Sequence, residues 1–163
     1  MGATQRFSRQ GSMLPGVDSA SRLWQIADAA RTFLEPHWKK WHESWGPPAP
    51  STASQWTCMR TAAFLAFALE HAGFAAKVAT GRPRPKLDEM GCGFWANDGW
   101  QSHAWVVCGD HIVDITADQF GHPEIIIELT SGGRYRPGHD PESTLSLTEN
   151  GALAVQELMK VWK

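Results

Sequence analysis

The chain has 163 residues, of which 42% are hydrophobic and 20% are charged, and its formal net charge at pH 7 is −2. That length suits one compact domain and is short for two, and the hydrophobic fraction excludes an intrinsically disordered chain. The small net charge offers no broad basic field for nucleic acid, and no apolar run is long enough to span a bilayer, so we expect neither nucleic acid nor membrane as a partner.

The N-terminal part of the chain predicts a tail and then a helix. Residues 1–16 are polar and rich in Gly, Ser, Gln and Arg, so we expect a disordered tail before a single domain over residues 17–163. Ser19 or Ser21 is a candidate cap for a helix that runs to about Leu34. Its apolar residues recur at helical spacing, at Leu23, Ile26, Ala27, Ala30 and Leu34.

Pro36 is expected to break this helix, because proline lacks the backbone N–H and clashes with the preceding turn. A second helical piece is predicted over residues 37–45. It would place the indoles of Trp38, Trp41 and Trp45 on one face.

A helix that begins near Cys58 is the first feature with chemical interest. The segment Cys58 to Ala72 is rich in Ala and Leu, Gly73 is a suitable stop, and Ser51, Thr52 and Ser54 are candidate N-caps. Cys58 therefore lies in or near the first turn, where unpaired N–H groups and the helix dipole favour a thiolate.

Beyond Gly73, a strand is predicted over residues 74–80, followed by a long irregular loop from Gly81 to Gln101. Loops of this length inside a compact domain are usually functional or disordered. Because it contains Phe94, Trp95 and Trp100 and leads directly into His103, we interpret it as one wall of a substrate cleft.

The segment from residue 103 to residue 116 predicts a β-hairpin. Gly109 and Asp110 form a two-residue turn between apolar runs, which pairs Cys108 with His111 and continues outward. Since side chains alternate along a strand, His103 and Asp114 then become diagonal neighbours on one face.

The C-terminal part predicts a short strand at residues 125–127, a turn at Gly132 and Gly133, and a polar irregular segment over residues 134–143. A final helix is expected to be capped by Thr148 or Asn150.

The predicted elements offer a thiol, an imidazole and a carboxylate, which is the set of groups needed to activate a cysteine nucleophile. Asp118 stays open as an alternative to Asp114, because it lies only slightly further along a predicted turn. The alternative for Cys58 is a purely structural role as a small buried hydrophobic residue. The three cysteines include no CxxC pair, so we expect no disulfide framework, no metal site and a reduced, cytoplasmic setting.

A cysteine at a helix start, a strand with His103-Ala-Trp and an aspartate on the next strand together resemble the transglutaminase-like branch of the papain-like cysteine enzymes. The triad order is also similar to that of arylamine N-acetyltransferases, and the run from Asp114 to Phe120 resembles small bacterial and phage proteins of this general type. The resemblance covers about Gln55 to Phe120. It implies that Cys58 is the nucleophile, His103 the base and Asp114 the orienting carboxylate.

The fold we expect is α+β, with N-terminal helices and the nucleophile helix packed on a mostly antiparallel sheet. The expected activity is thiol-dependent acyl transfer or hydrolysis of a peptide or protein amide, or of a thioester, without a metal or organic cofactor. Six residues are candidates for substrate contact: Gln55, which could donate to an oxyanion, and Trp56, Trp95, Trp100, Trp105 and Gln119. The alternative is a catalytically idle domain that binds a peptide or protein in a tryptophan-lined groove. The oligomeric state stays open.

Overall fold

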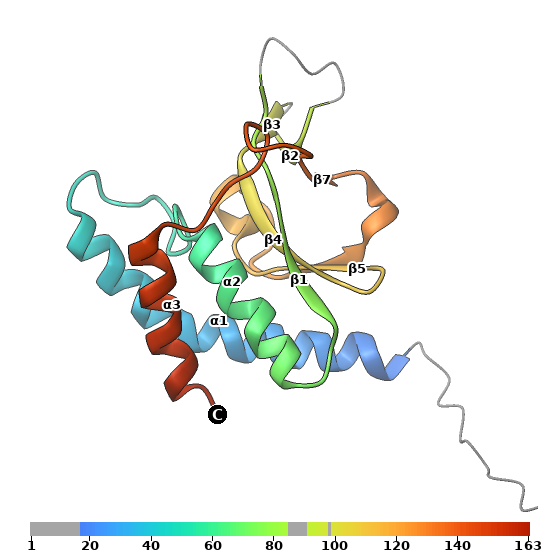
Figure 1. The fold of residues 1–163 in the computed structure, drawn as a ribbon, viewed down its shortest axis with the longest axis horizontal. Helices are drawn as coiled ribbons and strands as arrows, with labels where there is room; N and C mark the ends of the chain where they lie inside the picture. The colour runs from blue at the N-terminus through green and yellow to red at the C-terminus, as the bar shows by residue number, and fades with distance from the viewer. Residues whose placement is uncertain (1–16, 85–90, 98) are drawn as a thin grey trace, which may run out of the picture.

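The structure is a computed structural model that describes residues 17–84, 91–97 and 99–163 (Figure 1). The tail expected at residues 1–16 lies outside this range. Within the described residues the chain forms three α-helices and two antiparallel sheets, so the predicted α+β class is confirmed. None of the described helices is long and apolar enough to cross a membrane.

The larger sheet has four strands in the order β1-β4-β5-β6. They are β1 (Ala76–Gly81), β4 (His103–Cys108), β5 (His111–Asp114) and β6 (Ile126–Leu129). The predicted hairpin register is found, with Val106 opposite Val113 and Cys108 opposite His111. Gly109 has a φ of +63°, the left-handed conformation that a two-residue hairpin turn of the primed type requires.

The smaller sheet has three strands in the order β3-β2-β7. They are β3 (Gly99–Gln101), β2 (Gly93–Ala96) and β7 (Tyr135–Arg136). The prediction of an irregular loop from Gly81 to Gln101 is therefore wrong over its second half, where β2 and β3 form a hairpin. The strand signal is weak there because glycines interrupt it, and pairing with β7 from much further along the chain completes the sheet.

Helix α1 (Val17–Trp45) runs without interruption through Pro36, so the predicted break at this residue is wrong. Leu34 and Trp38 flank the proline, and neither side chain is exposed. The indole N–H of Trp38 also donates to Thr61 Oγ1 at 2.9 Å. Packing on both sides of Pro36 outweighs the single backbone hydrogen bond that proline removes.

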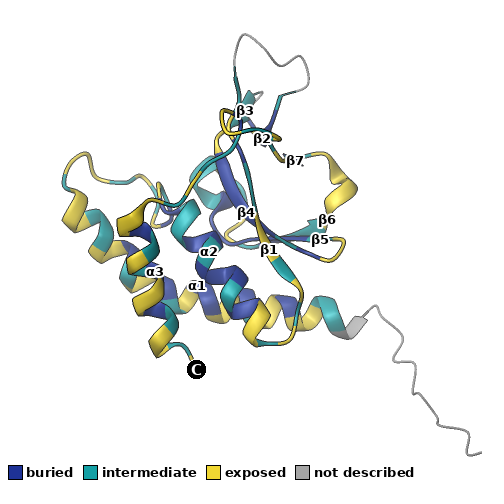
Figure 2. Ribbon diagram, viewed as in Figure 1, coloured by how far each residue is buried: buried dark blue, intermediate teal, exposed yellow. Residues whose placement is uncertain are grey.

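Helix α2 (Cys58–His71) lies between the larger sheet and the other two helices, and it is the middle element of the core (Figure 1). Figure 2 shows buried stretches on both α2 and β4, and the buried residues Ala104, Val106 and Cys108 of β4 belong to the same core cluster as those of α2. Gly73 follows the helix with a φ of +92°, as predicted for its stop. The predicted N-caps are wrong, because Thr57 is the N-cap and its hydroxyl donates to the Ser54 carbonyl at 2.7 Å instead of capping the helix.

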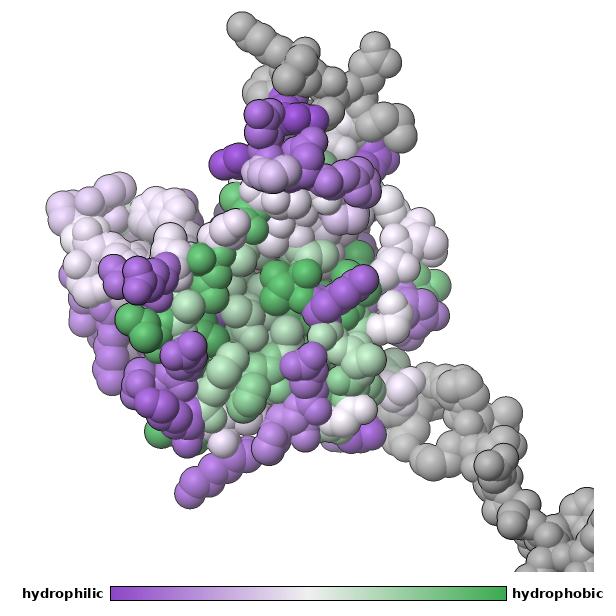
Figure 3. All heavy atoms as spheres, in the orientation of Figure 1, coloured by the Kyte–Doolittle hydropathy of each residue, from purple (hydrophilic) through white to green (hydrophobic). Residues whose placement is uncertain are grey.

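Helix α3 (Glu149–Val161) packs on α2 and ends the fold. The predicted cap at Thr148 is confirmed, since its Oγ1 accepts a hydrogen bond from Gly151 N. On the face seen in Figure 3, apolar surface gathers over the middle of the molecule, around α2 and β1, and hydrophilic residues gather towards its ends.

Candidate active site

The candidate site is built around a contact between His103 on β4 and Asp114 at the end of β5. His103 Nε2 lies 2.7 Å from Asp114 Oδ2, and the two side chains are 0% and 1% exposed. The hairpin register brings them together, because each lies on the same face of the sheet and diagonally across the strand pair. The diagonal contact predicted from the sequence is therefore present.

Asp114 accepts two hydrogen bonds on each carboxylate oxygen. Oδ1 accepts from the backbone N–H and the hydroxyl of Thr116, at 2.9 and 3.1 Å. Oδ2 accepts from His103 and from the Tyr135 hydroxyl at 2.8 Å. Burial by itself raises the pKa of Asp114, but the charge of His103 and the four hydrogen bonds hold this pKa below its usual range.

His103 is enclosed by aromatic rings. Phe94 and Phe120 meet its imidazole edge to face, at centroid distances of 5.6 and 5.1 Å, and Trp105 stacks on it at 6.2 Å. Burial by itself lowers the pKa of His103, but the Asp114 carboxylate and the Cys58 thiol outweigh burial and raise this pKa to about 10. The ring is therefore held ready to carry a positive charge.

One ring nitrogen of His103 has no hydrogen-bond partner in the described part of the chain. Nε2 faces Asp114, whereas Nδ1 is buried and has no hydrogen-bond partner among the described residues. Cys58 acts on the same ring, because its thiol is one of the groups that raise the His103 pKa. The thiol is thus close enough to interact with the imidazole, although it does not meet the full geometry of a hydrogen bond to Nδ1. Catalytic hydrogen bonds are often long before substrate binds.

Cys58 is the first residue of α2, as the sequence predicted, and its side chain is partly buried. The first residues of a helix have N–H groups without intrahelical acceptors. Because the thiol of Cys58 interacts with the imidazole of His103, this helix start lies close to β4. The site therefore has a thiol, backbone donors and a base on neighbouring elements.

Asp118, the alternative to Asp114, belongs to a different network. Its carboxylate accepts hydrogen bonds from both terminal nitrogens of Arg31, at 3.0 and 3.1 Å, and from the hydroxyl of Ser54 at 2.5 Å. His103 contacts Asp114, so the geometry favours Asp114 as the orienting carboxylate.

This second network holds Cys58 in place relative to Asp114. Arg31 on α1 is only 5% exposed and also donates to the carbonyl of Ile115 at 2.7 Å. Ser54 belongs to the turn that precedes α2, and Asp118 belongs to the 3₁₀ turn after β5. Their contacts therefore join the segment before the thiol to the segment after the carboxylate.

Sequence reasoning missed Arg31, Ser54, Thr116 and Tyr135 as supporting residues. Thr116 is two residues beyond Asp114, and this spacing is the signal for a side chain that accepts from the backbone two residues on. No comparable pattern marks the other three, because their partners lie 21 to 87 residues away along the chain.

The tryptophans predicted to contact substrate divide into two groups. Trp105 is 2% exposed and packs in the core behind His103, so its side chain offers no open surface for the substrate contact predicted for it. Its strand position faces the second sheet, which covers it. Trp95 and Trp100 pair across the β2-β3 hairpin with ring centroids 5.3 Å apart, and Trp95 is 45% exposed.

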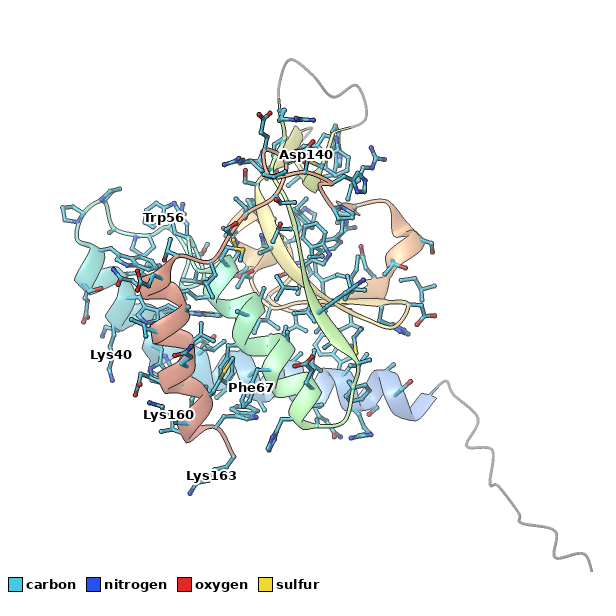
Figure 4. All side chains as sticks on the ribbon, in the orientation of Figure 1. Lys40, Trp56, Phe67, Asp140, Lys160 and Lys163 are labelled. Atoms are coloured by element: carbon cyan, nitrogen blue, oxygen red, sulfur yellow. The ribbon has the colours of Figure 1, made fainter. Side chains whose placement is uncertain are left out.

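Trp56 is 50% exposed and has a φ of +65°, which is rare for a residue with a large side chain. Figure 4 shows it beside the end of α1 and the start of α2. The carbonyl of Gln55 accepts from His42 Nε2 at 2.6 Å, which ties this turn to α1. Trp56 is therefore an exposed aromatic side chain two residues before the thiol.

The two glutamines have local hydrogen bonds. Gln55 Oε1 accepts from the backbone N–H and the hydroxyl of Ser51, at 2.6 and 2.9 Å. Gln119 Nε2 donates to the Thr116 carbonyl at 2.9 Å. Both side chains support the turns that flank the site.

No family model, curated protein or solved structure matches the chain. In the described ranges, no group of three or more His, Cys, Asp and Glu side chains is arranged to hold a metal ion.

Proposed function

We propose that this protein is a thiol-dependent acyltransferase or hydrolase of the transglutaminase-like type, acting on a peptide or protein amide or on a thioester. Cys58 is the nucleophile, His103 the base and Asp114 the orienting carboxylate. The observation that carries the proposal is the imidazole of His103, which is bound to a buried carboxylate through Nε2 and leaves Nδ1 without a partner beside a helix-start thiol.

The reaction begins from the thiolate of Cys58, whose proton is held on His103 Nδ1, because the raised pKa of His103 keeps its ring protonated. The thiolate attacks the acyl carbon and forms a C–S bond, and the backbone N–H groups at the start of α2 stabilise the oxyanion. As the C–N or C–S bond of the substrate breaks, the leaving group takes the proton from Nδ1. Water or an amine then attacks the thioester and gives its proton to Nδ1. The C–S bond to Cys58 breaks, and release of the acyl product leaves the Cys58 thiolate beside the protonated imidazole.

Asp114 has two effects on this cycle. Its hydrogen bond fixes the imidazole orientation so that Nδ1 is the nitrogen available to the thiol. Its charge stabilises the imidazolium that forms when the thiol is deprotonated, consistent with the raised pKa of His103. Neither effect requires a metal or an organic cofactor.

The test is the alkylation rate of Cys58 by iodoacetamide over a range of pH. In a Cys92→Ala/Cys108→Ala background Cys58 is the only thiol, so intact mass reports on it alone. We expect rapid alkylation well below the unperturbed thiol pKa of about 8.5. His103→Gln should return the rate profile to that of an ordinary thiol, and circular dichroism should show that the variant is folded.

Turnover is then measured with a panel of amide and thioester substrates. Cys58→Ala should abolish product formation, and Asp114→Asn should lower it by up to about 10⁴-fold, as in a serine protease triad. An ordinary thiol profile in the parent protein, unchanged by His103→Gln, would rule the proposal out.

The idle binding-domain alternative predicts the opposite ranking of variants. A cavity of about 670 Å³ lies between α1 and the loop before α2, and its lining residues include no tryptophan. They are Glu35, Lys39, His42, Glu43, Gly46, Pro47, Ala49, Pro50 and Ala53.

If the protein is an idle binding domain, Trp95→Ala and Trp100→Ala should abolish ligand binding, and Cys58→Ala should leave every measurable function intact.

A further inference from the structure

Tyr135 reaches the candidate site from the smaller sheet. It lies on β7, opposite Phe94 on β2, and its side chain is 4% exposed. Its ring packs against Phe94 and Trp105, with centroid distances of 4.9 and 5.2 Å. Because these neighbours fix the ring, the hydroxyl is delivered to one place, 2.8 Å from Asp114 Oδ2.

The oxygen that Tyr135 contacts is the one that holds His103. Asp114 accepts two hydrogen bonds on each oxygen, and a carboxylate has about four acceptor sites, so its acceptor sites are occupied. Thr116 fixes Oδ1, and Tyr135 shares Oδ2 with the imidazole. The phenol O–H therefore affects both the charge on Oδ2 and the direction from which His103 can approach it.

We propose that Tyr135 is a positioning residue for the Cys58 reaction: by donating to Asp114 Oδ2 it keeps the carboxylate aligned with His103, and so sustains the reactivity of the thiol. This inference rests on the proposed function. It also assigns a role to the smaller sheet, because β2 places Phe94 against the His103 ring and β7 places Tyr135 on its carboxylate.

The first experiment measures the pKa of Asp114 by following its carboxyl carbon with NMR as pH is lowered. A hydrogen bond to a charged group is worth about 1.5–3 kcal/mol, so Tyr135→Phe should raise the pKa of Asp114 by about 1–2 pH units. Tyr135 is the only tyrosine in the chain. Uniform 3-fluorotyrosine labelling therefore changes this one phenol to a stronger donor, and it should lower the Asp114 pKa. If Tyr135→Phe does not fold, the pKa of Asp114 in the labelled protein tests the contact instead.

The second experiment measures whether the effect reaches the thiol. In the single-cysteine background, Tyr135→Phe should slow the alkylation of Cys58 at pH about 6 by about tenfold and move the acid limb of the profile to higher pH. In an Asp114→Asn background, Tyr135→Phe should cause no further decrease, because both changes act through one carboxylate. Thr116→Val is the matched comparison on Oδ1. It keeps the oxygen shared by His103 and Tyr135, and it should slow alkylation less than Tyr135→Phe.

A purely structural role would lower the free energy of unfolding and leave both the acid limb and the Asp114 pKa in place. The inference is overturned if Tyr135→Phe folds and keeps the parental acid limb of Cys58 alkylation and the parental pKa of Asp114. If His103→Gln has no effect on Cys58, the proposed function fails, and the Asp114 titration then decides the Tyr135 contact by itself. If His103→Gln slows alkylation and Tyr135→Phe does not, only the positioning role fails.

Discussion

Ser54 Oγ lies 2.5 Å from Asp118 Oδ1, and this contact joins the turn before Cys58 to the turn after Asp114. Arg31 binds the same carboxylate from α1. Cys58 and Asp114 are therefore held in register by a polar network that contains neither of them and does not contain His103. Disturbing this network tests how the site is assembled without changing its reacting groups.

Ser54→Ala removes the hydroxyl that donates to Asp118. Ser54 is 0% exposed, so water does not replace the lost donor, and hydrogen bonds to charged groups contribute about 1.5–3 kcal/mol. We expect a loss of that size in the free energy of unfolding measured with urea. Ser44→Ala is the control, because this exposed serine donates to the Trp41 carbonyl and its loss should cost under about 0.5 kcal/mol. Equal losses for the two variants would contradict the structural role of Ser54.

Arg31→Met leaves the partly buried carboxylate of Asp118 beside Ser54 without its cation. Removing one partner of a fully buried ion pair costs about 3–5 kcal/mol, and we expect a smaller loss here because Asp118 is partly exposed. The double variant Arg31→Met/Asp118→Leu should recover a large part of this loss, because no unpaired charge stays behind. Arg22→Met is the matched control on the same helix, since Arg22 is exposed and donates to the Ala72 carbonyl. Thermal and urea unfolding check the ranking, and a double variant less stable than Arg31→Met would refute it.

The pH dependence of stability follows from the raised pKa of His103. The pKa is about 10 in the folded protein and 6.5 in its ordinary state, so the folded state binds the proton more tightly. The stability that His103 contributes is therefore fully present below pH 6.5 and is lost as pH rises towards about 10. The free energy of unfolding of the parent protein minus that of His103→Gln should shrink over this range.

Asp114→Asn should remove the same pH dependence, because the carboxylate is the group that raises the His103 pKa. On the acid side the sign reverses. The lowered pKa of Asp114 contributes stability above its ordinary value of 3.8, and this stability is lost as pH falls through the folded pKa. If the free energy of unfolding of the parent protein minus that of His103→Gln stays constant from pH 6.5 to about 10, His103 is not held as an imidazolium.

Gly81→Ala tests the junction between the two sheets. A Cβ at Gly81 would overlap the backbone N and Cα of Gly93, and β1 and β2 are both held at this point by other strands. Overpacking of this kind costs at least about 1–3 kcal/mol. Gly132→Ala is the control, because the nearest atom to its Cβ is 3.6 Å away on the flexible Glu128 side chain. Urea unfolding should separate the two, and similar stabilities would show that the sheets can move apart.

The β4-β5 hairpin and the His103–Asp114 contact could be predicted because both depend on local rules. A two-residue turn sets which residues lie opposite each other, and the alternation of side chains sets which face they share. The start of α2 at Cys58 and its end before Gly73 follow in the same way from helix-forming residues and a glycine stop.

Predictions failed where a distant partner decides the outcome. Pro36 does not break α1, because Leu34 and Trp38 are packed on either side of it. Trp105 is not open to substrate, because the smaller sheet covers it, and that sheet depends on β7 pairing with β2. Intrinsic preferences of a few tenths to a few kcal/mol are overruled by burial of large side chains.

The sequence by itself determined the order of thiol, imidazole and carboxylate, the register that joins the last two, and the position of the thiol at a helix start. Only the tertiary structure decided that Asp114 rather than Asp118 meets His103, that Tyr135 and Thr116 fill the carboxylate, and that Arg31 binds Asp118. The physical reason is separation along the chain. Turn chemistry and strand alternation act over a few residues, whereas a buried hydrogen-bond network is chosen by which distant polar groups are desolvated together and must satisfy one another.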